Sequence, residues 1–124
     1  NVKIIYHTST SGKNYVREFI LSLQKHQQAK IRRLLQLITE YGLSSIIPHT
    51  KKLSGTPLWE IRILGKNSIR IIYVVLHINT ILALHGFIKK TQKTPRKEIN
   101  TALKGTKTGL TNDIIYDIMT PYMN

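Results

Sequence analysis

The most regular hydrophobic pattern in the chain lies between residues 58 and 90 and predicts three consecutive β-strands: Leu58–Leu64, Ile69–His77 and Thr80–Ile88. The first strand alternates between apolar and polar positions, as half-buried strands do. The other two are rich in Val, Ile and Leu, which is typical of strands in a core. The links between them are short and predict tight turns, so we expect an antiparallel meander.

Apolar residues at helical spacing predict two helices before these strands and one after them. The first helix follows a turn rich in Ser, Thr and Gly, in which Ser11 is the expected cap, and the second ends at Gly42. We expect these two helices to form an αα-hairpin. Pro95 predicts the start of the last helix and Gly105 its end. Residues 43–57 are expected to form a loop.

A short strand at Val2–His7 completes the order β-α-α-β-β-β-α and predicts an α+β fold. We expect a small, mostly antiparallel sheet with the N-terminal αα-hairpin and the C-terminal helix packed on one face. The other face would be uncovered and would carry the cations. Residues 1–104 are expected to form one domain, followed by a C-terminal extension at 105–124. Ile114–Met119 there predict a short helix, whose role as a docking helix or a contact for another chain stays open.

The charge of the chain is strongly positive, with 19 Lys and Arg against 6 Asp and Glu and a formal net charge of +13. Such an excess indicates a polyanionic partner, namely RNA, DNA, an anionic membrane or an acidic protein, although simple solubilisation is the plain alternative. The absence of cysteine excludes disulfides and thiolate chemistry and fits a cytosolic protein. No apolar run approaches the ~20 residues of a membrane span.

Familiar catalytic and metal-binding motifs are missing from the sequence. Thr10–Lys13 reads "TSGK", but the earlier glycine and the following Ser or Thr of a phosphate-binding loop are absent. The five histidines have no metal-binding spacing, and the few carboxylates are scattered. We therefore expect any chemistry to proceed without a metal or a cofactor.

The predicted meander brings charged residues of its strands toward one another. Glu60 and Arg62 are two apart on one strand and share a face. Arg70 lies on the neighbouring strand, and Lys89 and Lys90 end the third. One carboxylate among several cations suits RNA self-cleavage. In that reaction a base takes the proton of the ribose 2′-hydroxyl, cations stabilise the phosphorane, and an acid protonates the leaving 5′-oxygen. The plain alternative is a surface ion pair between Glu60 and Arg62, worth under ~1 kcal/mol.

Three segments, "KKLSGTPLWEIRI", "IRIIYVVL" and "LHGFIKKTQKTPRKEINTAL", together with the order of elements, resemble the RelE/HigB superfamily of type II toxins, in particular its phage-derived, HigB-like branch. The resemblance covers about residues 2–104. It implies a RelE/ParE-like fold and a cytosolic toxin that cleaves mRNA in the ribosomal A site without a metal. It also implies neutralisation by a co-encoded antitoxin, usually a helix-turn-helix protein of the HigA kind.

The resemblance also implies roles for the basic residues. Arg62 matches a basic residue of the second strand, Arg70 matches the arginine of a YR-x-x-Y pattern that here reads "IRIIY" with Tyr73, and Lys89 and Lys90 match a basic pair at the end of the last strand. Basic residues of the two flanking loops are expected to bind RNA: Lys51, Lys52, Lys93 and Arg96.

The sequence departs from the family pattern at positions that decide which residues act as general base and general acid in RNA cleavage. RelE-like members have a lysine where Glu60 stands, and an aromatic–His ending found in some HigB members is missing. Glu60 is the first choice as general base. His49, in the cationic loop, and His85 are weaker candidates, and a place in the core or at an interface is the favoured explanation for His85.

Two other functions fit the same scaffold. A non-catalytic toxin of the ParE type would inhibit DNA gyrase, and fold alone does not exclude it. A basic nucleic-acid-binding module would bind RNA with strong salt dependence and form no product. Cations placed within strands favour the nuclease over the gyrase inhibitor, since a protein-binding toxin has less need of Arg70 in the middle of a strand.

Overall fold

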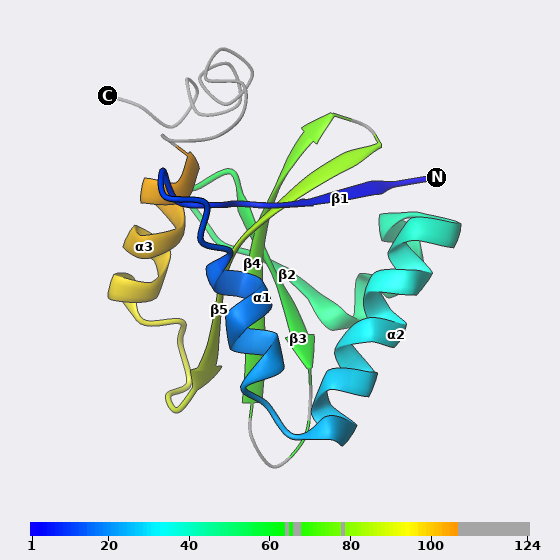
Figure 1. Ribbon diagram of the computed structural model, residues 1–124, viewed down its shortest axis with the longest axis horizontal. Coiled ribbons are helices and arrows are strands. Elements are labelled where there is room, and N and C mark those ends of the chain that lie inside the picture. Colours follow the sequence, from blue (N-terminus) through cyan, green and yellow to red (C-terminus); the bar gives the residue numbers. More distant parts are fainter. Residues whose placement is uncertain (64, 66–67, 78, 107–124) are drawn as a thin grey trace.

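The computed structural model describes residues 1–106 except 64, 66, 67 and 78. Its elements are, in chain order, β1 (Lys3–Tyr6), α1 (Tyr15–Leu21), α2 (Lys25–Tyr41), the 3₁₀-helix η1 (Leu43–His49), β2 (Thr50–Lys52), β3 (Leu58–Ile63), β4 (Ser68–His77), β5 (Thr80–Lys89) and α3 (Arg96–Thr106) (Figure 1). The predicted mixed α+β class is confirmed. The short helix predicted at residues 114–119 lies outside the described residues.

The five strands form one sheet in the order β1-β5-β4-β3-β2. β1 pairs parallel with β5, and the other three pairings are antiparallel. In the register of the central strands, Arg62 lies opposite Arg70, and Ser68 lies opposite Lys89. The end of β3, the start of β4 and the end of β5 therefore meet at one end of the sheet.

The segment expected to be a loop contains regular structure, so the predicted order of elements was incomplete. Within residues 43–57, η1 buries Ile46 completely and β2 pairs with β3. The Lys52 ammonium lies 5.7 Å from the centre of the Trp59 ring on the neighbouring strand, which helps to hold this short edge strand. Three strand residues and one buried isoleucine are too weak a periodic signal to predict either element.

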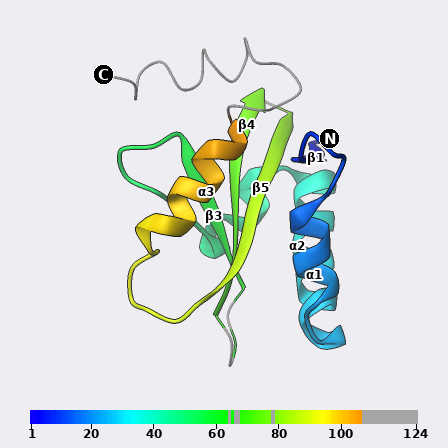
Figure 2. The same cartoon turned by 60° about the vertical axis from the view of Figure 1, so that its left-hand side comes forward.

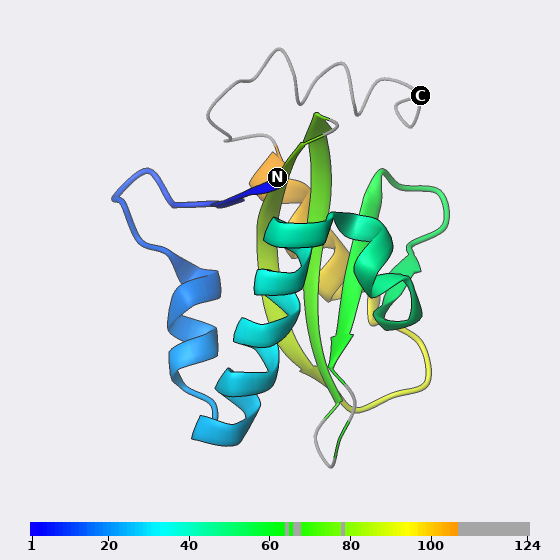
Figure 3. The ribbon, with the colours of Figure 1, turned by 90° about the vertical axis from the view of Figure 1, so that its right-hand side faces the viewer.

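Helices cover both faces of the sheet, and the prediction of helices on one face only was wrong. Figures 2 and 3 show α1 and α2 on one side and α3 on the other. One hydrophobic core lies under α1, α2 and η1 and includes Ile61, Ile71 and Ile81. A second lies under α3 and includes Ile72 and Leu82. Because β4 and β5 are apolar on both faces, both faces have to be covered.

The two N-terminal helices pack mainly on other elements and contact each other less than an αα-hairpin would. α1 lies on β5, where Phe19 packs against Gly86, and α2 contacts η1. Asn14 caps α1, its Oδ1 accepting from the Arg17 amide at 3.0 Å, so the cap is not Ser11 as predicted. Gly42 ends α2 with a φ of 86°, which agrees with the prediction. No helix in the described part of the chain has both the length and the apolar character needed to cross a membrane.

Candidate active site

Four strands bring charged side chains to one end of the sheet, on the face that α3 covers. Glu60 and Arg62 come from β3, Arg70 from the facing positions of β4, Lys89 from the end of β5, and Lys51 from β2, opposite Glu60. We call the four basic residues, arranged around Glu60, the cationic end. α3 contacts β5 and β4, and Figure 2 shows the segment between β5 and α3 passing the end of the sheet before the helix begins.

Glu60 and Arg70 form a buried pair at the base of the cationic end, whose other three basic residues keep exposed surface. Glu60 has no exposed surface and Arg70 retains 4%. The Arg70 Nε lies 3.7 Å from the Glu60 Oε1, too far for a hydrogen bond, and neither atom has another hydrogen-bond partner in the described residues. The Thr94 hydroxyl donates to the Glu60 Oε2 at 2.7 Å, and the Arg70 Nη1 donates to the carbonyl of Ile69 at 3.0 Å. The ion pair of Glu60 is therefore with Arg70 and is buried, whereas a surface pair with Arg62 had been the plain expectation.

The positive charges of the cationic end affect one another's protonation. Burial lowers the pKa of Lys89, and the nearby Arg70, Lys51 and Arg62 lower it further, while Glu60 opposes them. Burial also lowers the pKa of the Arg70 guanidinium, against the effect of Glu60. Lys89 is thus an ammonium that gives up its proton more easily than an ordinary lysine, which suits a proton donor.

Lys52, predicted to bind RNA, and Tyr73, part of the family pattern, lie away from the cationic end. Lys52 is on the opposite face of β2, against Trp59, and its ammonium donates to the carbonyl of Thr56. Tyr73 faces the core under α1 and α2, where burial raises its pKa to about 12. The remaining three basic residues are exposed and follow the end of β5: Lys90, Lys93 and Arg96.

The two histidines considered as bases have different surroundings. His85 Nε2 lies 2.9 Å from the Glu98 Oε1 of α3, and its ring stacks on Phe87. It therefore joins α3 to β5, in agreement with the packing explanation. His49, at the end of η1, lines a cavity together with Arg62. Within the described residues, no group of three or more His, Asp or Glu side chains is arranged to hold a metal ion.

One part of the site was missed from the sequence. The Thr94–Pro95 step indicated only a helix start, yet the Thr94 hydroxyl holds the buried carboxylate of Glu60. A sequence separation of 34 residues leaves no local signal for this contact. Lys51 was predicted only as an RNA-binding loop residue, and its place beside Glu60 follows from the pairing of β2 with β3.

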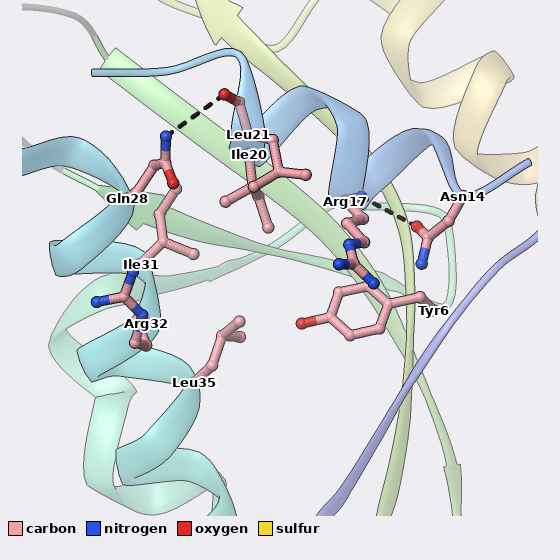
Figure 4. A pocket seen from close by; sticks show the side chains of 9 residues that line it. All are labelled: Tyr6, Asn14, Arg17, Ile20, Leu21, Gln28, Ile31, Arg32 and Leu35. Atoms are coloured by element: carbon pink, nitrogen blue, oxygen red, sulfur yellow. Dashed lines mark hydrogen bonds between the residues drawn. The ribbon is translucent and has the colours of Figure 1, made fainter. Parts of the chain in front are cut away.

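A second hollow lies on the other face, between α1 and α2, with a volume of about 350 Å³. Figure 4 shows its apolar lining, with Ile20, Ile31 and Leu35 turned inward and the guanidinium of Arg17 near the ring of Tyr6. It contains none of the residues predicted for catalysis. Arg32 lines this hollow and is not part of the cationic end.

Comparison with known families gives one match. The family model described as Phage derived protein Gp49-like (DUF891) matches residues 18–107, which include the whole cationic end. No curated protein matches the chain in sequence.

Proposed function

Because the chain belongs to the Gp49-like family, a phage-derived, toxin-like family related to the RelE superfamily, we propose that it is the toxin of a type II toxin-antitoxin system and cleaves mRNA on the ribosome. We place it in the HigB-like branch, acting in the cytoplasm, with a helix-turn-helix antitoxin as its partner. The observation that carries the proposal is the cationic end, where four strands supply basic side chains around one buried carboxylate.

Each group has a role that its surroundings allow. Arg62 and Lys51 keep exposed surface and hold the scissile phosphate, stabilising the charge that develops on the phosphorane. Lys89, with its lowered pKa, donates a proton to the leaving 5′-oxygen. Solvent water takes the proton of the 2′-hydroxyl as its oxygen attacks phosphorus, and the bond from phosphorus to the 5′-oxygen breaks. The products are a 2′,3′-cyclic phosphate and a 5′-hydroxyl that carries the proton from Lys89.

Glu60 takes a different role from the one first expected. A general base has to contact the 2′-hydroxyl, and Glu60 has no exposed surface for that contact. We assign it as a positioning residue, which holds Arg70 beneath the phosphate and Thr94 in the segment before α3. This assignment leaves the basic residues of the rim to contact the RNA.

The test is mRNA integrity after brief induction in a bacterial host, mapped by primer extension. We expect cuts within translated codons for the wild type, and a loss of roughly a hundredfold or more for Lys89→Ala and Arg62→Ala. Lys25→Ala, an exposed cation at the start of α2, removes the same charge elsewhere and should leave the cuts unchanged. Arg70→Ala is a poor choice, because removing a buried partner also affects folding.

Two outcomes would contradict the proposal. Growth arrest with intact mRNA and a DNA-damage response would indicate a gyrase inhibitor of the ParE type. Salt-dependent RNA binding with no cleavage product would indicate a binding module.

A further inference from the structure

A second cluster of basic side chains lines a cavity of about 420 Å³ between α2 and the edge of β3. Lys30 and Arg33 come from α2, His49 from the end of η1 and Arg62 from the end of β3. Leucines of α2 and Ile63 form an apolar wall. We call this cavity the edge pocket.

The fold creates the edge pocket where β2 stops short. The pairing of β2 with β3 begins at Thr50, opposite Ile61, so Arg62 lies beyond the last paired position and His49 is the next residue on the other side. Lys30 and Arg33 are three apart on α2 and so lie on one side of the helix. α2, η1 and β3 therefore each contribute basic groups to a cavity beside the unpaired end of β3.

The positive charge of the edge pocket is not balanced by acidic residues in its lining. Four of its seven lining residues are basic or histidine, and none is acidic. Like charges gathered around an open cavity repel one another and attract anions. A plain solvated helix face would explain Lys30 and Arg33 by themselves. It does not explain why they share a cavity with Arg62 and His49.

We propose that the edge pocket binds a phosphodiester of an RNA strand, as a second phosphate site beside the cationic end. Arg62 belongs to both sites. An RNA backbone that leaves the cationic end therefore reaches the edge pocket by passing around the edge of β3. The choice of RNA as the polyanion rests on the proposed function. The two sites are nevertheless separable, because Lys30 and Arg33 are not part of the cationic end.

The experiment measures binding of a short, fully 2′-O-methylated RNA, which cannot be cleaved, to the full chain by fluorescence anisotropy across a range of salt. Arg33→Gln should weaken binding several-fold and reduce the slope of log K against log salt by about 0.7, the value for one phosphate contact on a single strand. Arg32→Gln is the matched control, since it removes the same charge from the next residue of α2, which lines the hollow of Figure 4. Circular dichroism on both variants establishes that α2 is intact. Equal binding by the two variants would exclude a free RNA strand as the source of the phosphodiester, and binding to ribosomes then decides the proposal.

A second arm identifies which RNA supplies the phosphodiester. Binding of the same variants to purified ribosomes without mRNA is measured in parallel. A loss with the oligonucleotide assigns the edge pocket to the substrate strand, and a loss with ribosomes alone assigns it to a ribosomal strand. No specific loss for Arg33→Gln in either arm would refute the second phosphate site.

The two proposals fail in different ways. If mRNA is cut in the host but Arg33→Gln binds both the oligonucleotide and ribosomes like the wild type, the edge pocket is refuted and the nuclease stands. If Arg33→Gln loses binding but the wild type leaves mRNA intact, the edge pocket stands and the nuclease is refuted.

Discussion

Glu60 and Arg70 are opposite charges that folding removes from water without giving them good hydrogen bonds to each other. Taking each ion out of water costs several kcal/mol, and only excellent geometry offsets that cost. Here the Nε–Oε1 distance is 3.7 Å and both atoms lack a hydrogen-bond partner within the described part of the chain. A pair of this kind contributes little to stability, and unsatisfied buried polar groups tend to occur at functional sites. Its position under the cationic end agrees with that tendency.

Removal of one member of this pair should be costly. We expect Arg70→Ala to lower the free energy of unfolding by about 3–5 kcal/mol, because it leaves the Glu60 carboxylate buried without a counter-charge. The double variant Glu60→Leu/Arg70→Met removes both charges and should recover most of that loss. Urea unfolding of the wild type and both variants measures the effect. If Arg70→Ala were as stable as the wild type, Arg70 would be the surface cation that the sequence first indicated.

The lowered pKa of Lys89 makes a prediction about the pH dependence of cleavage. The donor must be protonated, so activity should fall as pH rises through its pKa, and burial brings that fall to a lower pH than for an ordinary lysine. Lys89→Arg keeps the charge but stays protonated, so its activity, although lower, should not decline over this range. Cleavage rates on ribosome-bound mRNA from neutral to alkaline pH measure the difference. The same alkaline decline in both proteins would show that another group titrates.

The helices and strands that have a regular hydrophobic period were the ones that the sequence predicted correctly. The three strands predicted at residues 58–88 agree with β3, β4 and β5 to within one residue at each end. β2 and η1 were missed, because a three-residue edge strand and one buried isoleucine leave no period to recognise. The covering of both sheet faces was missed as well. Cations at the end of one face were interpreted as exposure of the whole face, although Ile72 and Val74 on that face are buried.

The site was predictable to a similar degree. The two-residue period of β3 placed Glu60 and Arg62 on one face, and the meander placed Arg70 beside them. The hydrogen bond of Glu60 with Thr94 was not predictable, because Thr94 reaches it from another part of the chain. The place of Lys51 depended on a strand that had not been predicted.

The docking of α1 on the sheet depends on the absence of a side chain at Gly86. A Cβ at this position would lie 2.3 Å from the Phe19 Cδ2, so Gly86→Ala should force α1 away from β5. We expect a loss of about 1–3 kcal/mol in the free energy of unfolding, as for other overpacked cores. Phe19→Leu in the same background should recover part of it, so a double-mutant cycle by urea unfolding would give a coupling energy. A neutral Gly86→Ala would mean that α1 is held loosely.

For the whole molecule, the net charge of +13 works against compactness and in favour of anionic partners. Exposed basic side chains repel one another in the free protein, and binding of a polyanion would relieve that repulsion. The fold tolerates the charge because almost all of it lies on the surface, while two apolar cores hold the sheet between its helices. Stability of the whole fold is therefore governed by the cores, and a titratable group inside one of them can control it.

Tyr73 is such a group, 3% exposed on the central strand β4 and packed under α1 and α2. Burial raises its pKa from 10.0 to about 12 in the folded protein. Because the pKa of Tyr73 is higher in the folded protein, the unfolded chain loses this proton first as pH rises. The stability that depends on the neutral phenol is therefore complete below pH 10 and is lost as pH rises toward 12. Two pKa units correspond to about 2–3 kcal/mol.

Between a pH below 10 and a pH near 12, we expect the free energy of unfolding to fall by that amount more for the wild type than for Tyr73→Phe, as measured by urea unfolding. Taking the difference between the two proteins cancels the titration of the other tyrosines and the lysines, so an equal loss in both would show that Tyr73 ionises in the folded state as it does in water.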